Sequence, residues 1–239
     1  MEKHTDREKK RTAAALTCLL FALMAGMVIA YAVIADDRIF YFVSVTMMML
    51  TIAAIFIGTE RKRSRTSEIV IVSTMVTIAV VCRAAFFMLP EIKPAAAVVI
   101  ISAVCLGERT GFMIGALSMF ISNFSLVGAP CQMFVMGMTG LIAGAVINLH
   151  EKMRSPLAMA AVSGVCTFTV YGLLVDIWTA FGFYARPTPE SVLAVYAAAV
   201  ALNAIFAVST GIFVFFFGEP VIKKIDRVKL KYGIFYSRI

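Results

Sequence analysis

The stretch Glu60-Arg61-Lys62-Arg63-Ser64-Arg65 decides how this chain is threaded. It holds four of the 22 Lys and Arg residues and lies between two apolar stretches, residues 39–58 and 67–89. Cytoplasmic loops of membrane proteins collect Lys and Arg. The pattern therefore predicts that residues 60–65 form a cytoplasmic loop between two membrane-spanning helices.

The other basic residues repeat this arrangement in four further patches: Lys3 to Arg11, Arg109, Lys152 with Arg154, and Lys223 to Arg238. Eight spans with both termini in the cytoplasm place all five patches on the inner side of the plasma membrane. Only Arg38, Lys93 and Arg186 then lie outside, and Arg83 lies within a span. Removing any one span would move a basic patch outside, so the charges predict eight spans.

Composition assigns the chain to the multi-pass membrane proteins. Hydrophobic residues make up 61% of the sequence, charged residues only 15%, and the mean hydropathy is +0.92. Soluble domains carry about a quarter charged residues. The net charge of +8 is explained by cytoplasmic loops beside anionic lipid. Because the basic residues form separate clusters beside the spans, we expect the lipid bilayer and not nucleic acid as a partner.

The predicted fold is all-α, with eight spans in three regions. Residues 1–66 form an N-terminal transmembrane hairpin and a basic linker, residues 67–218 a six-helix core, and residues 219–239 a basic cytoplasmic tail. The first apolar run is too long for the h-region of a signal peptide. The helices are expected near residues 13–35, 39–58, 67–89, 95–106, 111–127, 132–148, 156–181 and 190–217. Residues 95–106 are short for a span, and residues 107–111 are expected to form a tight turn.

Small residues recur at a spacing of four in the predicted helices. The pairs are Gly111/Gly115, Gly140/Gly144, Ala160/Gly164 and Ala197/Ala201. Small residues let membrane helices approach closely. We interpret these pairs as internal packing faces, and the alternative is docking to another membrane subunit.

Motifs for catalysis or for a metal are missing from the sequence. There is no GxxxxGK[ST] loop for nucleotide hydrolysis, no HExxH, and no CxxC pair among the five cysteines. Neither histidine lies near a serine and an aspartate on the outer side. We therefore expect no enzyme activity, no catalytic or metal-binding residues and no cofactor.

Four polar side chains within the predicted spans point to a site in the outer half of the membrane. They are Arg83, Asn123, Gln132 and Asp176. Polar groups inside a membrane are expensive and mark functional sites by default. Two explanations stay open: a ligand site, or a structural Arg83–Asp176 ion pair with the two amides bonded to backbone.

Aromatic residues are expected at the same level: Phe86, Phe87, Phe124, Tyr171, Trp178, Phe181, Phe183 and Tyr184. An interfacial aromatic belt would explain them. The inner helix ends are poor in Trp and Tyr, however, which favours an outward small-molecule pocket. The candidate substrate-binding residues are Arg83, Phe87, Asn123, Gln132, Asp176, Trp178 and Tyr184.

Several stretches, taken in order, resemble the substrate-binding S component of an energy-coupling factor (ECF) vitamin transporter, most closely the cobalamin-type S components. They are Arg83-Ala84, KPAAAVVII at 93–101, Leu106-Gly107, GFMIGALS at 111–118, Ser122-Asn123-Phe124, Pro130-x-Gln132-Met133-Phe134, Gly137-x-x-Gly140-x-x-Ala143-Gly144 and Asp176-Ile177-Trp178. The resemblance covers about residues 67–217.

This resemblance implies a six-helix membrane protein that binds a vitamin, with cobalamin favoured, at its extracellular face. It also implies a transmembrane coupling subunit and two cytoplasmic ATPases as partners, which agrees with the missing nucleotide loop. The sequence departs from the family in the extra spans at 13–58 and in a short loop at 127–131 without a Trp-rich segment. In place of an Ala-xxx-Ala docking motif it has Ser73 and Thr77. The alternative is a membrane subunit that docks or regulates others through the hairpin and binds no ligand itself.

Overall fold

The computed structural model describes residues 66–125, 131–183 and 188–232, and all the regular secondary structure within them is helical. The predicted spans at 13–35 and 39–58 lie outside the described residues, apart from four isolated helical positions between 46 and 53. What the structure describes is therefore the predicted six-helix core and most of the basic tail.

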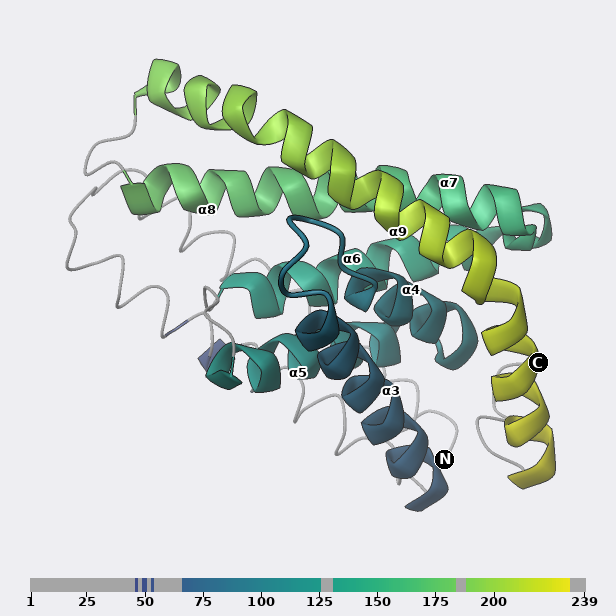
Figure 1. Cartoon of the computed structure of the whole chain (residues 1–239). Coiled ribbons are helices and arrows are strands. Elements are labelled where there is room, and N and C mark those ends of the chain that lie inside the picture. Colours follow the sequence, from purple (N-terminus) through teal and green to yellow (C-terminus); the bar gives the residue numbers. More distant parts are fainter. Residues whose placement is uncertain are drawn as a thin grey trace, which may run out of the picture.

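The helices follow the apolar stretches of the sequence (Figure 1). In chain order they are α3 Thr66–Ala85, α4 Ala95–Leu106, α5 Glu108–Ser125, α6 Cys131–Leu149, a 3₁₀ turn η1 Glu151–Arg154, α7 Pro156–Cys166, a π-helical segment η2 Thr167–Gly172, α8 Leu173–Phe183 and α9 Pro189–Tyr232. The bounds predicted for residues 95–106 are confirmed. The stretch predicted as one helix at 156–181 is α7, η2 and α8 in unbroken succession.

Helix α4 forms the centre of the bundle. All of its residues except Val98 are buried, and it contacts α3, α5, α6 and α9. Its sequence, AAAVVIISAVCL, is apolar on every side, as a helix enclosed by others requires. Helix α9 crosses over α7 and α8 and packs along α4 (Figure 1). The shortness of α4 thus reflects a core helix surrounded by longer ones.

Glycines of α5 and α6 let these helices close onto α4. A Cβ atom added to Gly111 would lie 2.2 Å from the Cβ of Ala103, and one added to Gly144 would lie 2.6 Å from the same atom. A Cβ on Gly140 would meet Val99 at 2.6 Å. These separations are far below van der Waals contact, so only glycine fits. The packing interpretation of the Gly111 and Gly140 faces is confirmed.

A second close crossing joins α7 to α9. A Cβ on Gly164 would lie 3.2 Å from the carbonyl oxygen of Ala207, and one on Gly211 would lie 3.2 Å from that of Ala160. The Ala160/Gly164 pair therefore packs internally, as predicted. The Ala197/Ala201 pair does not, because both residues are exposed on the outer face of α9.

Three predicted boundaries were wrong. Helix α3 ends at Ala85 and not at Leu89, because residues 86–93 form turns that include Glu91 at φ 56°. The break after α4 is Gly107 alone, at φ 99°, and α5 begins at the next residue. Helix α9 was expected to end near residue 217. It continues through Pro220 to Tyr232, because Ile225 is buried against the core and holds the extension in place.

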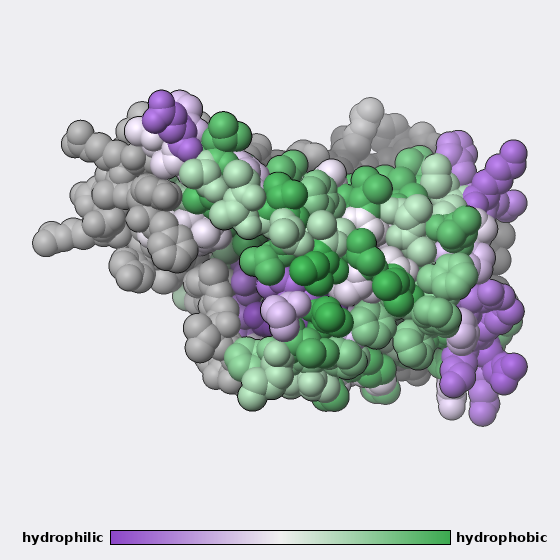
Figure 2. Space-filling model, turned by 45° about the horizontal axis from the view of Figure 1, so that its top comes forward, coloured by the Kyte–Doolittle hydropathy of each residue, from purple (hydrophilic) through white to green (hydrophobic). Residues whose placement is uncertain are grey.

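The outer surface is that of a membrane protein. Four of the described helical segments are long and apolar enough to cross a bilayer: Glu68–Ala85, Cys131–Leu149, Pro156–Gly182 and Pro189–Tyr232. Many large apolar side chains face outward, such as Val81, Leu193 and Phe216 at 58%, 70% and 65% exposure. Figure 2 shows hydrophobic surface over most of the described helices, with hydrophilic residues gathered mainly toward the ends. Lipid is the environment that this surface fits.

Candidate functional site

The bundle has two chemically different ends. At one end α3 and α5 finish and α6 begins, which brings Arg83, Asn123 and Gln132 together. We call this the Arg83 end. At the other end α4 finishes, and Cys105, Arg154 and Lys229 line a common cavity. We call this the Lys229 end.

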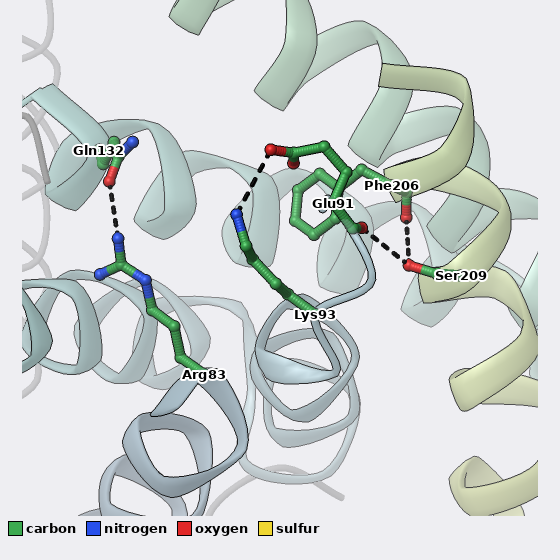
Figure 3. Close-up of polar contacts among 6 residues, drawn as sticks. All are labelled: Arg83, Glu91, Lys93, Gln132, Phe206 and Ser209. Carbon is green, nitrogen blue, oxygen red and sulfur yellow. Dashed lines mark hydrogen bonds and ion pairs between the residues drawn. The ribbon is translucent and has the colours of Figure 1, made fainter. Parts of the chain in front are cut away.

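Arg83 occupies the centre of a polar cluster shared by three helices. Its Nη1 donates to the Asn123 Oδ1 at 2.9 Å and to the hydroxyl of Ser122, and its Nη2 donates to the Gln132 Oε1 at 3.0 Å. Figure 3 shows the side chain reaching from the end of α3 to Gln132 on α6. Arg83 is only 8% exposed and Ser122 is fully buried. The guanidinium is thus held in a fixed orientation by three neutral acceptors.

A charged loop lies beside this cluster, between α3 and α4. The Lys93 Nζ pairs with the Glu91 Oε1 at 3.3 Å (Figure 3). The Ser209 Oγ on α9 lies 3.4 Å from the Glu91 carbonyl oxygen and 3.0 Å from that of Phe206. These contacts attach the loop to α9, so the Arg83 end is tied to the longest of the described helices.

The π-helical segment η2 brings Tyr171 into the same region. Its ring packs edge-on against Phe206 at 4.9 Å between centroids. The Phe206 carbonyl oxygen lies 3.0 Å from the Ser209 hydroxyl, which also contacts the carbonyl oxygen of Glu91. Single π-helical turns are uncommon and are often found at functional sites, because they rotate one side chain out of the regular α-helical register. Here the altered register coincides with the polar layer.

Asp176 forms a separate polar pair with α9. Its Oδ2 accepts a hydrogen bond from the Asn203 Nδ2 at 2.6 Å, and its side chain is 5% exposed. No ion pair among the described residues includes Arg83 or Asp176. The hypothesis of an Arg83–Asp176 ion pair is therefore wrong, and each of these buried charges is bonded to neutral groups instead.

The aromatic candidates occupy different environments. Trp178 on α8 is buried at 7% exposure, whereas Phe87, in the turns after α3, is 51% exposed. Tyr184 lies outside the described residues. Of the seven predicted site residues, the structure joins Arg83, Asn123 and Gln132 by hydrogen bonds, and Asp176 on α8 is bonded to Asn203 instead.

Two contributing residues were missed by the sequence analysis. Ser122 accepts a hydrogen bond from Arg83, and Asn203 donates to Asp176. Asn203 is an amide within the predicted span at 190–217, so the criterion that selected Asn123 could have found it. Ser122 gave no comparable signal, because serine is common in transmembrane helices and usually bonds to its own backbone.

The Lys229 end contains a cavity of about 290 Å³ between α4, α7 and α9. Its lining mixes both signs of charge: Arg154, Glu219, Lys223, Asp226 and Lys229. Lys229 donates to the carbonyl oxygen of Cys105 in the last turn of α4 and pairs with Asp226 at 3.1 Å. Within the described ranges, no three His, Cys, Asp or Glu side chains gather closely enough to hold a metal ion.

Comparisons with known protein families, with curated proteins and with solved structures found no match.

Proposed function

We propose that this chain is the substrate-capture subunit of an ECF-type ABC importer. It binds a vitamin or a related micronutrient, with cobalamin favoured, at the extracellular face and delivers it through a partner coupling subunit. Two separate cytoplasmic ATPases drive the transport. The observation that carries the proposal is the buried cluster of Arg83, Ser122, Asn123 and Gln132. A membrane protein does not need a buried charge in order to fold, so a charge at this position indicates a functional site.

The charge distribution supports the direction of capture. The basic residues Arg109, Lys152, Arg154 and Lys223 to Lys231 gather toward the Lys229 end or beyond it. By the positive-inside tendency this end faces the cytoplasm, so the Arg83 end faces outward. The proposal includes eight crossings with both termini in the cytoplasm, two of them supplied by the N-terminal hairpin.

The exposed face of α3 supports a membrane partner. Ser73 and Thr77 are exposed on this face, and their hydroxyls donate back to the carbonyls of Ile69 and Ser73 at 2.8 Å. Because both hydroxyls already have hydrogen-bond partners within the helix, Ser73 and Thr77 are small side chains that need no polar partner from a neighbouring helix. In the proposed assembly this face contacts the coupling subunit.

Ligand retention by the purified chain tests the proposal. The full-length protein is expressed in cells, purified in mild detergent and heated, and the released small molecules are identified by mass spectrometry. We expect a vitamin-class compound from the wild type and from Asn148→Ala, and much less from Asn123→Ala. Asn148 is a matched control, because it bonds to Arg154 at the opposite end of the bundle. Equal retention by both variants would contradict the assignment of the site.

A second candidate is a membrane subunit that docks or regulates other subunits and has no ligand of its own. The exposed small residues Ala197 and Ala201 on α9 favour it, because they pack against nothing within the described bundle. It predicts that Ala197→Leu abolishes co-purification of partner subunits while no small molecule is recovered from any variant. Capture predicts a recovered ligand whatever the state of this face.

A further inference from the structure

The Arg83 guanidinium is buried without a carboxylate to neutralise it. Its three hydrogen-bond partners, Ser122, Asn123 and Gln132, are all uncharged. Among the described residues the ion pairs are Lys93–Glu91, Lys223–Glu219 and Lys229–Asp226, and Arg83 belongs to none of them. A buried charge is normally paired, because neutral hydrogen bonds offset only part of the lost hydration.

No acidic side chain of the described residues contacts Arg83 directly. Glu91, in the loop after α3, is paired with Lys93 at 3.3 Å. Asp176 is hydrogen-bonded to the Asn203 amide and forms no ion pair with Arg83. Taken alone, the group of Arg83, Lys93 and Glu91 carries one net positive charge in a setting of low dielectric constant, which strengthens its attraction to an anion.

The geometry also leaves donors available. An arginine has five N–H groups in a rigid fork. Arg83 makes three hydrogen bonds, two from Nη1 and one from Nη2, so the Nε–H and one hydrogen of Nη2 remain. The Nε–H lies on the edge of the guanidinium plane that it shares with Nη2, and this is an edge at which arginine binds a carboxylate or a phosphate. The three acceptors hold the guanidinium in place.

We propose that the ligand captured at the Arg83 end carries an anionic oxygen group, a carboxylate or a phosphate, that binds the free edge of the Arg83 guanidinium. The inference rests on the proposed function and narrows it to acidic vitamins and phosphate-containing micronutrients. Asn123 and Gln132 then act as positioning residues that orient Arg83. Cobalamin meets the requirement through the phosphodiester of its nucleotide loop.

Matched pairs of compounds test this directly on the wild-type protein. Two pairs differ only in the acidic group: flavin mononucleotide and riboflavin, and pantothenate and panthenol. A third pair, cobalamin and cobinamide, differs in the whole nucleotide loop that carries the phosphate. Binding to the full-length protein in lipid nanodiscs is measured by isothermal titration calorimetry. We expect one acidic member to bind about 10- to 100-fold more tightly than its neutral partner, the range for charge-assisted hydrogen bonds to arginine. The pair that responds distinguishes phosphate from carboxylate.

Variants identify the residue responsible. Arg83→Gln should abolish the preference for the acidic member, and Arg83→Lys should retain part of it because the charge remains. Arg154→Gln is the matched control, because Arg154 is exposed at the Lys229 end and bonds to a single asparagine. If Arg83→Gln fails to fold, the comparison of the paired compounds on the wild type still decides the question.

Three results would overturn the inference, and they are distinguishable. If a neutral member binds as tightly as its acidic partner, capture stands and the anionic group is refuted. If the acidic preference persists in Arg83→Gln, the anion binds elsewhere. If neither the compound pairs nor the material released from the purified chain yields a ligand, small-molecule capture fails and this inference fails with it.

Discussion

Replacement of Gly144 by alanine should force α4 and α6 apart. The new Cβ would lie 2.6 Å from the Cβ of Ala103, a residue with no exposed surface. Carbon atoms in contact sit about 3.5–4.0 Å apart, so the helices must separate locally by about 1 Å. Overpacking of this kind in a close-packed core costs about 1–3 kcal/mol. The added methyl group gains little helix propensity in return, since a transmembrane segment stays helical when the bundle opens.

The single tryptophan of the chain makes the measurement simple. Trp178 is 7% exposed in the bundle, so its fluorescence reports loss of packing during thermal unfolding in detergent. A loss of 1–3 kcal/mol corresponds to a fall in midpoint of roughly 2–12 °C for a chain of this size. Gly218→Ala is the matched control. Its new Cβ would lie 3.2 Å from the flexible end of Met159 and in ordinary contact with Val214 at 3.6 Å, so the midpoint should move little.

A second substitution distinguishes a clash between residues 144 and 103 from a non-specific loss of stability. In Ala103→Gly the offending Cβ is gone, and the nearest atom to a Cβ on residue 144 is then the residue 103 carbonyl carbon at 3.3 Å. The double variant should therefore be more stable than the two single losses predict, by at least about 1 kcal/mol. The same change should not rescue Gly111→Ala, where the Ala103 Cα lies at 2.8 Å. Additive losses at positions 103 and 144 would refute the reasoning.

Three further predictions concern polar contacts. Lys229→Met removes the donor to the Cys105 carbonyl and should lower the thermal midpoint by the equivalent of about 1–3 kcal/mol. Lys224→Met, on the exposed face of α9, should leave the midpoint unchanged. Equal midpoints for the two variants would contradict the role of Lys229 as a cap on the end of α4. Asp176→Leu leaves the Asn203 amide without its acceptor and should lower the free energy of unfolding, measured in SDS, by about 1.5–3 kcal/mol. Asp176→Asn should lower it by less, since an amide oxygen still accepts the hydrogen bond. The reverse order would argue against this pair. Glu91→Val should be about 1–2 kcal/mol less stable by calorimetry than Glu91→Asn, because both lose the ion pair but only asparagine tolerates the positive φ; indistinguishable variants would show that the turn relaxes.

The sequence predicted the elements that hydropathy and breakers define. Residues 95–106 stand between Pro94 and Gly107, and the helix has those bounds. Boundaries that depend on tertiary contact were not predictable. The helix predicted to end near residue 217 continues through Pro220 as α9, because Ile225 packs on the core and Lys229 bonds to α4.

The candidate site, like the helices, was predictable from the sequence only in part. Polar residues in apolar surroundings were visible in the sequence, and Arg83, Asn123 and Gln132 do meet. The hydrogen-bond partners of Arg83 and Asp176 were not visible in the sequence. Their opposite charges suggested an ion pair, but the fold decides which helices are neighbours. Helix α8 directs Asp176 to Asn203 on α9, away from Arg83. No short sequence pattern around Asp176 indicates that its partner is Asn203.

The length of α9 lets a single helix join the two ends of the bundle. At 1.5 Å per residue its 44 residues measure about 66 Å along the helix path, roughly twice the hydrocarbon thickness of a bilayer. Asn203 bonds to α8 near one end of this path, and Lys229 bonds to the last turn of α4 near the other. A displacement of α9 at Asn203 can therefore reach the end of α4 along continuous helical backbone, without passing through a loop.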